Sequence, residues 1–313
     1  MEQPLYNRFP AVWAVMVTHH PPETVTRSIE ILLPQVVGLV VVDNASDTTE
    51  KERLKYLERQ SGGAVHLMEN PANEGLARAQ NQGIHYALTA GAEWVLLMDD
   101  DSMPAEDMVA QLLSVLTEDS VPETIALLSP SVHEVSTGQV AKYVQRGWFG
   151  FRRVAFGEKN TLEVLAVIAS GSLIRAAALR DVGGMVDDFF IDYIDTEFSL
   201  RLIGEGWRVV AVRGAVLQHR LGNKTMHRLG SLRLTATNHS PVRRFTIYRN
   251  RVRVWRRYWW EAGAYVWYDI LAAGYDLMRI LLVERQKWQK LTAALRGIGA
   301  GLRAPRPVPG PFY

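Results

Sequence analysis

Three consecutive aspartates follow a short apolar segment near the end of the first third of the chain. Residues 94–98 are all apolar, and Asp99, Asp100 and Asp101 come directly after them. Adjacent carboxylates repel one another, so holding them at the end of a buried strand costs stability unless a cation neutralises them. Mg²⁺ and Mn²⁺ prefer oxygen ligands and can bridge carboxylates to a diphosphate. The run therefore predicts a divalent-metal site, with an acidic helix cap ahead of Pro104 as the structural alternative.

A second acidic group lies within residues 189–201. Asp195 falls where a helix should begin, and a helix N-terminus favours the ionised carboxylate that a general base needs. Asp192 either caps this helix or belongs to the site. Glu197 either orients a substrate hydroxyl or pairs with Arg201, four residues further along.

A histidine forms the third group. His219 ends an apolar stretch, and Arg220, Lys224 and Arg228 follow it. Such a cationic run suits a diphosphate, and a neutral imidazole can complete an oxygen-rich metal site.

The elements that must position these residues alternate between strands and helices. Apolar runs at 11–17, 36–42, 64–68 and 94–98 predict strands, and helical spacing at 23–33, 47–60 and 74–89 predicts the intervening helices. This alternation indicates an α/β fold with a parallel sheet covered by helices, whose functional residues lie at the carboxyl ends of the strands. Further strands are expected at 125–128, 165–169 and 209–212, and a helix at 195–203.

From Pro241 onward the chain reads as helical, basic and aromatic. Arginines and tryptophans crowd one stretch: Arg243, Arg244, Arg249, Arg251, Arg253, Arg256 and Arg257, with Trp255, Trp259 and Trp260. Basic residues attract anionic lipid and tryptophans settle at the membrane interface, so we interpret the stretch as a membrane-surface patch. A solvated helix with core tryptophans is the alternative. Without a helix-turn-helix, zinc or other recognisable RNA-binding motif, we expect no nucleic-acid partner.

Composition restricts the remaining possibilities. Of the 313 residues, 48% are hydrophobic and 22% charged, which suits a globular protein with a core. The absence of cysteine excludes disulfides and thiolate metal ligands, so a metal must use oxygen or imidazole ligands. We find no basic signal-peptide region and no run of about 20 apolar residues, so we expect neither secretion nor a spanning helix.

Together these motifs resemble those of family-two glycosyltransferases, and more closely their L-rhamnosyltransferase branch. The resemblance extends over residues 12–257 and rests on the segments 41–46, 73–83, 99–101, 170–172, 190–201 and 219–222. Residues 228–250 further resemble rhamnosyltransferases that use lipid-linked or lipid acceptors. The resemblance implies a GT-A fold, a Rossmann-like mixed sheet, over residues 1–240. We further expect a C-terminal helical extension over 241–302 that associates with the membrane. A flexible proline-rich tail is expected over 303–313.

The resemblance also implies roles for individual residues. Thr18 and Asp43 would line the pyrimidine–ribose pocket with Arg78 close by, while Asp195 would be the catalytic base. His19 and His20 stand where the family usually has an aromatic residue and an asparagine. The metal ligands would be Asp99, Asp101 and His219; the nucleotide-sugar site would add Asn44, Asn73, Asp100, Arg220 and Lys224. Acceptor contacts are expected from Asp192, Glu197 and Trp148.

The resulting hypothesis is an inverting transferase that uses Mg²⁺ or Mn²⁺ and moves L-rhamnose from dTDP-L-rhamnose to a hydroxyl of a lipid-linked glycan or glycolipid. Surface polysaccharide, such as O-antigen, or rhamnolipid would be the product. We expect a cytoplasmic protein, peripheral on the inner membrane, with oligomerisation left open. The alternatives are a UDP-sugar donor, as for galactofuranosyl or glucosyl transfer, and a non-catalytic membrane adaptor. A dinucleotide-binding dehydrogenase is disfavoured because Pro21 and Pro22 occupy the loop that would need glycines.

Overall fold

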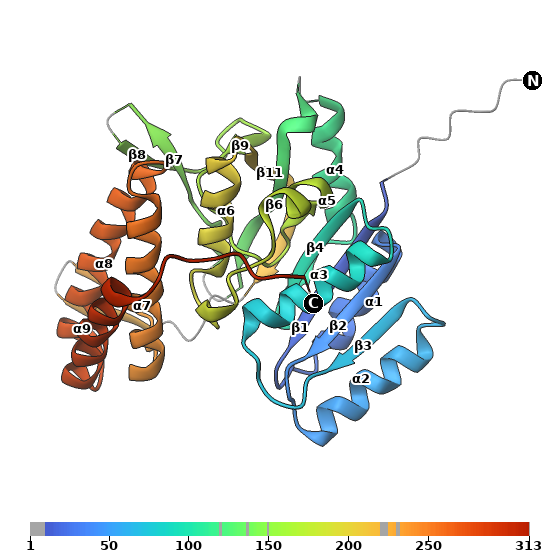
Figure 1. The fold of residues 1–313 in the computed structure, drawn as a ribbon, viewed down its shortest axis with the longest axis horizontal. Coiled ribbons are helices and arrows are strands. Elements are labelled where there is room, and N and C mark those ends of the chain that lie inside the picture. Colours follow the sequence, from blue (N-terminus) through green and yellow to red (C-terminus); the bar gives the residue numbers. More distant parts are fainter. Residues whose placement is uncertain are drawn as a thin grey trace, which may run out of the picture.

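A curled mixed sheet forms the centre of the molecule (Figure 1). The computed structural model describes residues 10–118, 121–135, 138–148, 150–219, 225–229 and 232–312. Within these ranges, one nine-stranded sheet has the order β3-β2-β1-β4-β10-β6-β11-β5, with β9 also paired to β11. Its strands are β1 (Val12–Thr18), β2 (Gly38–Asp43), β3 (Val65–Glu69), β4 (Trp94–Asp99), β5 (Met103–Pro104), β6 (Ile125–Glu134), β9 (Thr161–Glu163), β10 (Leu173–Arg175) and β11 (Arg208–His219).

The first half of the sheet is parallel. Strands β3, β2, β1 and β4 run in the same direction, so Thr18, Asp43 and Asp99 end their strands at one edge. Strand β10 is antiparallel to both β4 and β6, which makes the sheet mixed. Every residue of β2 is buried, as expected for a strand covered on both faces. The α/β class and the mixed GT-A-like sheet are thus confirmed.

Helices cover both faces of the sheet. Core residues of α1 (Val25–Leu32), α2 (Thr48–Gln60) and α4 (Met108–Glu118) pack on one face. Those of α3 (Leu76–Thr89), α5 (Ala176–Val182) and α6 (Ile194–Gly204) pack on the other. Short 3-10 turns lie at Leu33–Gln35, Pro122–Thr124 and Asp187–Phe189.

The expected strand at residues 165–169 is absent. Ala166 makes only an isolated bridge with Val144. The paired strand lies earlier, at β9, and the segment then turns through Gly171, whose φ of +78° favours glycine. An apolar run can form either a buried strand or a buried connecting segment, and hydrophobic periodicity alone does not distinguish these two structures.

Three helices form the C-terminal part: α7 (Pro241–Tyr258), α8 (Gly263–Val283) and α9 (Lys287–Arg303). Val254 of α7 and Val266 of α8 belong to the same hydrophobic core cluster as residues of the sheet. The C-terminal helices and the sheet domain therefore share one core. The division at residue 240 remains a prediction. Two hairpins accompany the helices: β7 (Tyr143–Gly147) with β8 (Gly150–Val154), and β12 (Thr225–Leu229) with β13 (Leu232–Ala236).

The proline-rich tail returns to the sheet domain instead of extending away from it (Figure 1). The amide of Gly310 donates to Met185 O at 2.9 Å, and the amide of Gly184 donates to Gly310 O at 3.2 Å. A Cβ at Gly310 would lie 2.4 Å from Nδ2 of Asn81. The expectation of a flexible tail is not met over residues 304–312, because backbone pairing and close packing give it fixed partners.

Among the helices that the structure describes, none combines the length and the apolar character that crossing a membrane requires.

Candidate active site

A pocket of about 590 Å³ opens at the carboxyl edge of the parallel strands. Residues at or just after the ends of β1, β2, β4 and β11 line it, together with residues of α3, of the loop before α6 and its first turn, and of the segment that leads into α7. The polar and aromatic ones are His19, Asn44, Asn73, Gln80, Asp99, Asp100, Asp101, Phe190, Asp192, Tyr193, Asp195, His219, Thr237, His239 and Arg243. The volume lies in the range that small-molecule ligands occupy.

Strand pairing brings the histidine to the aspartates. The short strand β5 pairs with the end of β11, placing Gln218 opposite Met103. As a result, ligand atoms of Asp99, Asp101 and His219 all lie within 4.8 Å of one another. His219 Nδ1 is 3.4 Å from Asp101 Oδ1 and 2.6 Å from Ser102 Oγ. The structure thus gathers the three residues that the sequence had suggested as metal ligands.

Two serine hydroxyl groups, of Ser170 and Ser102, connect the residues of this cluster by hydrogen bonds. The amide of Asp99 donates to Ser170 Oγ at 3.1 Å, and Ser170 Oγ donates to Ser102 Oγ at 2.8 Å. Ser102 in turn contacts the His219 ring. Hydrogen bonds of this kind orient the ligands of metal sites.

Burial, with the neighbouring carboxylates, raises the pKa values of two of the aspartates. Burial, followed by the charges of Asp101, Asp100 and Asp195, raises the pKa of Asp99 to about 7. Burial raises the pKa of Asp100 to about 6, although the amide of His19, 3.1 Å from Asp100 Oδ2, acts against this. The cluster therefore carries negative charge at a cost that a bound cation would offset.

Asp195 occupies the first turn of α6, in the same pocket. Its Oδ1 accepts a hydrogen bond from the amide of Thr196 at 2.7 Å. Burial raises its pKa to about 6 and the charge of Asp192 adds to the shift, while backbone hydrogen bonds from Thr196 and Ala169 lower it. A carboxylate of this kind is ionised at neutral pH yet more basic than a solvated aspartate, as a general base requires.

The loop before Asp195 has an unusual backbone. Phe190, Asp192 and Tyr193 have φ values of +63°, +66° and +68°. Such conformations are strained for residues with a Cβ and persist only where the surroundings hold them. Helix α7 supplies that support: the fully buried Nδ2 of Asn250 lies 3.0 to 3.1 Å from the carbonyl oxygens of Phe189, Ile191 and Asp192.

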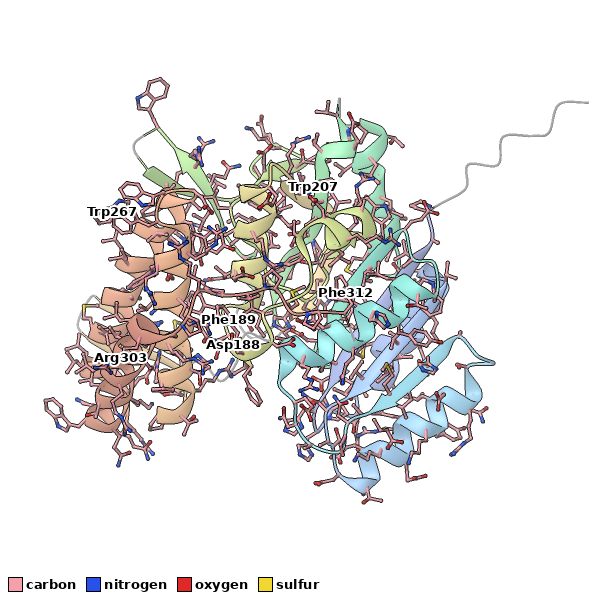
Figure 2. All side chains as sticks on the ribbon, viewed as in Figure 1. Asp188, Phe189, Trp207, Trp267, Arg303 and Phe312 are labelled. Atoms are coloured by element: carbon pink, nitrogen blue, oxygen red, sulfur yellow. The ribbon has the colours of Figure 1, made fainter. Side chains whose placement is uncertain are left out.

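A second set of contacts holds Tyr193. Its hydroxyl lies 2.8 and 3.0 Å from the carboxylate oxygens of Asp269 on α8. Arg251 of α7 donates to the same hydroxyl and to Asp269, and Trp255 Nε1 donates to Asp269 at 2.8 Å. Figure 2 shows the neighbouring Asp188 and Phe189 between the sheet and these helices. The C-terminal helices thus hold the loop that leads into α6 and Asp195.

Asp192 and Glu197 have different environments. Asp192 does not cap α6, whose N-cap is Tyr193; it makes two 3.0 Å hydrogen bonds with Arg243 at the pocket wall. Glu197 is buried outside the pocket and pairs with Arg201 at 3.0 Å, the alternative that its spacing had suggested. It also accepts a hydrogen bond from Tyr258 at 2.7 Å. The expected acceptor role for Glu197 has no support in this geometry.

The expected nucleotide-binding residues divide into two groups. Asn44 and Asn73 line the pocket and are joined by a 3.0 Å hydrogen bond. Thr18 and Asp43 are fully buried below them and do not line it. Thr18 Oγ1 donates to Asp43 at 3.0 Å, and Asp43 also accepts from the amide of Ser46 at 3.1 Å. Their geometry shapes the turn that presents Asn44.

Two other expected residues, Arg78 and Trp148, are not brought to the pocket. Arg78 pairs with Glu74 at 3.1 Å and is not part of the lining. Trp148, in the hairpin of β7 and β8, is 93% exposed and also lies outside the lining. Arg220 and Lys224 fall outside the described residues.

Three of the seven arginines of α7 do not belong to the surface patch that the sequence predicted. Arg244, Arg251 and Arg253 are buried. Arg244 pairs with Asp276 at 2.6 Å and Glu284 at 2.7 Å, Arg251 with Asp269 and Arg253 with Asp188. That interpretation was wrong for these three because carboxylates elsewhere in the sequence neutralise them: the buried Asp276, Glu284 and Asp269 for Arg244 and Arg251, and the exposed Asp188 for Arg253. Sequence analysis also missed His239 and Arg243 as pocket residues; the similarity noted for residues 228–250 was the available signal.

Comparisons with known proteins agree with this geometry. A family model described as "Glycosyl transferase family 2" matches residues 13–183. The chain is 29% identical over 250 residues to the dTDP-rhamnosyl transferase RfbF of Shigella flexneri, covering 79% of this chain and 80% of that protein. It is also 29% identical over 250 residues to the galactofuranosyltransferase GlfT1 of Mycobacterium tuberculosis, covering 77% and 81%.

Two solved structures share the fold. GalNAc-T7 with UDP, GalNAc and Mn²⁺ superposes with a TM-score of 0.62 at 18% identity, over 82% of this chain and 50% of that one. The 1–349 fragment of S. aureus TarS in complex with UDP-GlcNAc gives a TM-score of 0.60 at 15% identity, over 93% and 81%. This chain therefore spans half the length of the GalNAc-T7 chain. At these identities the likeness concerns the fold.

Proposed function

This chain belongs to glycosyl transferase family 2 and is a glycosyltransferase, and we propose that it works by a metal-dependent, inverting mechanism. One observation carries the proposal: Asp99, Asp101 and His219 line the same pocket as Asp195. The first three provide a site for a divalent metal and the diphosphate. The fourth is the base that activates the acceptor hydroxyl.

The residues at the metal position fit Mg²⁺ or Mn²⁺. Two carboxylates and one imidazole form a hard donor set, and the raised pKa of Asp99 reflects negative charge that a cation would neutralise. A divalent cation bound there would neutralise the charge that develops on the departing diphosphate.

In the proposed reaction Asp195 accepts the proton of the acceptor hydroxyl. The acceptor oxygen bonds to the anomeric carbon, and the bond from that carbon to the diphosphate oxygen breaks on the opposite face, inverting the configuration. A retaining double displacement would need a second free carboxylate beside the sugar. Asp192, whose charge raises the pKa of Asp195, is instead bound to Arg243.

For the donor we propose dTDP-L-rhamnose, supported by the similarity to the dTDP-rhamnosyl transferase RfbF. The similarity to GlfT1 makes a UDP-sugar the second candidate. Mixing the protein with each donor, Mn²⁺ and a panel of glycoside acceptors tests the proposal, with product configuration read by NMR. We expect a product whose anomeric configuration is inverted relative to the donor. The variant Asp195→Asn is expected to lose this transfer. Retention of configuration would contradict the mechanism, and turnover of UDP-sugars alone would contradict the donor.

We further propose a lipid-linked or glycolipid acceptor, used at the cytoplasmic face of the inner membrane. The outer side of α8 supports membrane contact: Trp267, Leu271, Tyr275, Met278 and Leu282 recur on one helical face and are 38% to 61% exposed. Figure 2 shows Trp267 on the side of α8 that faces away from the sheet. Such a face lies in the membrane interface when tryptophans flank it, as the exposed Trp260 and Trp288 do here.

Flotation with anionic vesicles tests this contact. The double variant Trp267→Ser, Leu271→Ser is expected to lose most of its vesicle binding, since it removes apolar area from the centre of the face. Tyr56→Ser removes a comparably exposed aromatic side chain from α2 and is the matched control. Equal binding by all three proteins would contradict the assignment of this face.

A further inference from the structure

One wall of the pocket is formed by residues that do not belong to the proposed metal cluster. Asp195 shares this pocket with Asp99 of the metal cluster and with Asp192, which belongs to that wall. The wall includes Phe190, Asp192, Thr237, His239 and Arg243. All five lie beyond residue 183, where the family match ends.

The polar groups of this wall are preorganised and carry little net charge. Asp192 and Arg243 form a two-point ion pair with both distances at 3.0 Å. Burial, with the charges of Arg243 and Arg244 added, lowers the pKa of His239 to about 4, so its ring is neutral at physiological pH. Among the described lining residues Arg243 is the only lysine or arginine, and Asp192 already neutralises it.

Phe190 supplies a fixed apolar surface beside these groups. Its side chain is 43% exposed. Its other side packs on Gly75, where a Cβ would lie only 2.5 Å from the ring. Its backbone is anchored as well, because the carbonyl of Phe190 accepts from the amide of Leu76 at 2.7 Å. A rigid aromatic side chain next to preorganised donors and acceptors binds a small polar ligand with little loss of entropy.

Resting on the transferase function proposed above, we propose that Phe190, Asp192, His239 and Arg243 form the acceptor subsite and bind an uncharged sugar ring, presenting its hydroxyl to Asp195. The apolar face of the ring lies on Phe190, and its hydroxyl groups exchange hydrogen bonds with the ion pair and the imidazole. A phosphate group is disfavoured here because the carboxylate of Asp192 would repel it. The described residues of this wall offer no cation beyond Arg243, which Asp192 neutralises. The subsite shares its pocket with Asp195, as transfer of the acceptor proton to that carboxylate requires.

The test separates acceptor binding from donor binding. Octyl glycosides of neutral hexoses, and the same glycosides carrying a ring phosphate, are offered to the protein–dTDP–Mn²⁺ complex, and contacts are read by saturation-transfer NMR. Acceptor KM with dTDP-L-rhamnose is then measured for Arg243→Lys and His239→Ala, and donor Kd by calorimetry. Arg257→Lys is the matched control, because Arg257 lies on the same helix and pairs with Glu261 at 2.6 Å.

We expect the neutral glycosides to bind, and acceptor KM to rise about tenfold or more in both subsite variants, as loss of a charge-assisted or buried hydrogen bond implies. Donor Kd should stay within about twofold, and the control should match the wild type. Preference for the phosphorylated glycosides, failure of every neutral glycoside to bind, or an unchanged acceptor KM would overturn the subsite. Absence of donor binding by the wild type would instead count against the proposed function.

Discussion

Replacing Asp99 by asparagine should make the metal-free protein more stable while removing its response to metal. The pKa of Asp99 rises from 3.8 to about 7, chiefly through burial. At about 1.4 kcal/mol per pKa unit, ionising this carboxyl in the metal-free fold at pH 8 costs up to about 4 kcal/mol. Because the folded-state pKa lies above the unfolded one, this cost is absent below about pH 4 and grows until the pH passes 7. Asparagine keeps the shape without the charge.

The assay is thermal unfolding of wild type and Asp99→Asn at pH 8 and pH 5, each with Mn²⁺ and with a chelator. With chelator at pH 8 the variant's Tm should exceed that of the wild type by roughly 2–8 °C, and the gap should narrow at pH 5. Mn²⁺ should raise the Tm of the wild type at pH 8 and have little effect on the variant. Glu106→Gln, which removes an exposed carboxylate of the same charge, should show neither effect. A lower Tm for Asp99→Asn in chelator, or equal stabilisation of both proteins by Mn²⁺, would refute the reasoning.

Two further predictions concern Asp195 and its loop. Since the pKa of Asp195 is about 6 and the base must be ionised, kcat/KM should fall as the pH drops below 6, and a pH–rate profile that stays flat to pH 5 would count against Asp195 as the base. Asn250→Ala should leave the protein folded by circular dichroism but lower kcat by about tenfold or more, because the strained backbone before Asp195 loses its three-way support. The control Gln35→Ala removes a part-buried amide that bonds to Ile31 and Ala105, outside the pocket lining, and an equal loss of kcat there would show that the effect is not specific to this loop.

Local sequence patterns predicted the sheet and the main acids because both depend on residues close together in the chain. Apolar runs of strand length marked β1 to β4, and the aspartates stand directly at the end of β4. The nearness of His219 to Asp99 followed from the family resemblance, and the structure shows its cause in the pairing of β5 with β11. This short strand has no periodic signal of its own.

The errors arose where the decisive partner is distant in sequence. The arginines of α7 gave the composition of a lipid-binding surface, but Asp276 and Glu284, which neutralise Arg244, come 32 and 40 residues later. The tail has the composition of a flexible segment, yet Gly310 bonds to Met185, which lies 125 residues earlier in the sequence. Thr18 and Asp43 end their strands as expected, but both are fully buried and neither lines the pocket. Tertiary contacts of this kind leave no local pattern.

The central claim is that one pocket binds a nucleotide sugar through a metal held by Asp99, Asp101 and His219. Calorimetric titration of dTDP-L-rhamnose and of UDP-sugars, in Mn²⁺ and then in chelator, tests it most directly. We predict binding of dTDP-L-rhamnose that requires the metal and disappears in Asp101→Ala. Binding of equal strength in chelator, or in Asp101→Ala, would contradict the metal site, and a folded protein that binds no nucleotide sugar would contradict the whole account.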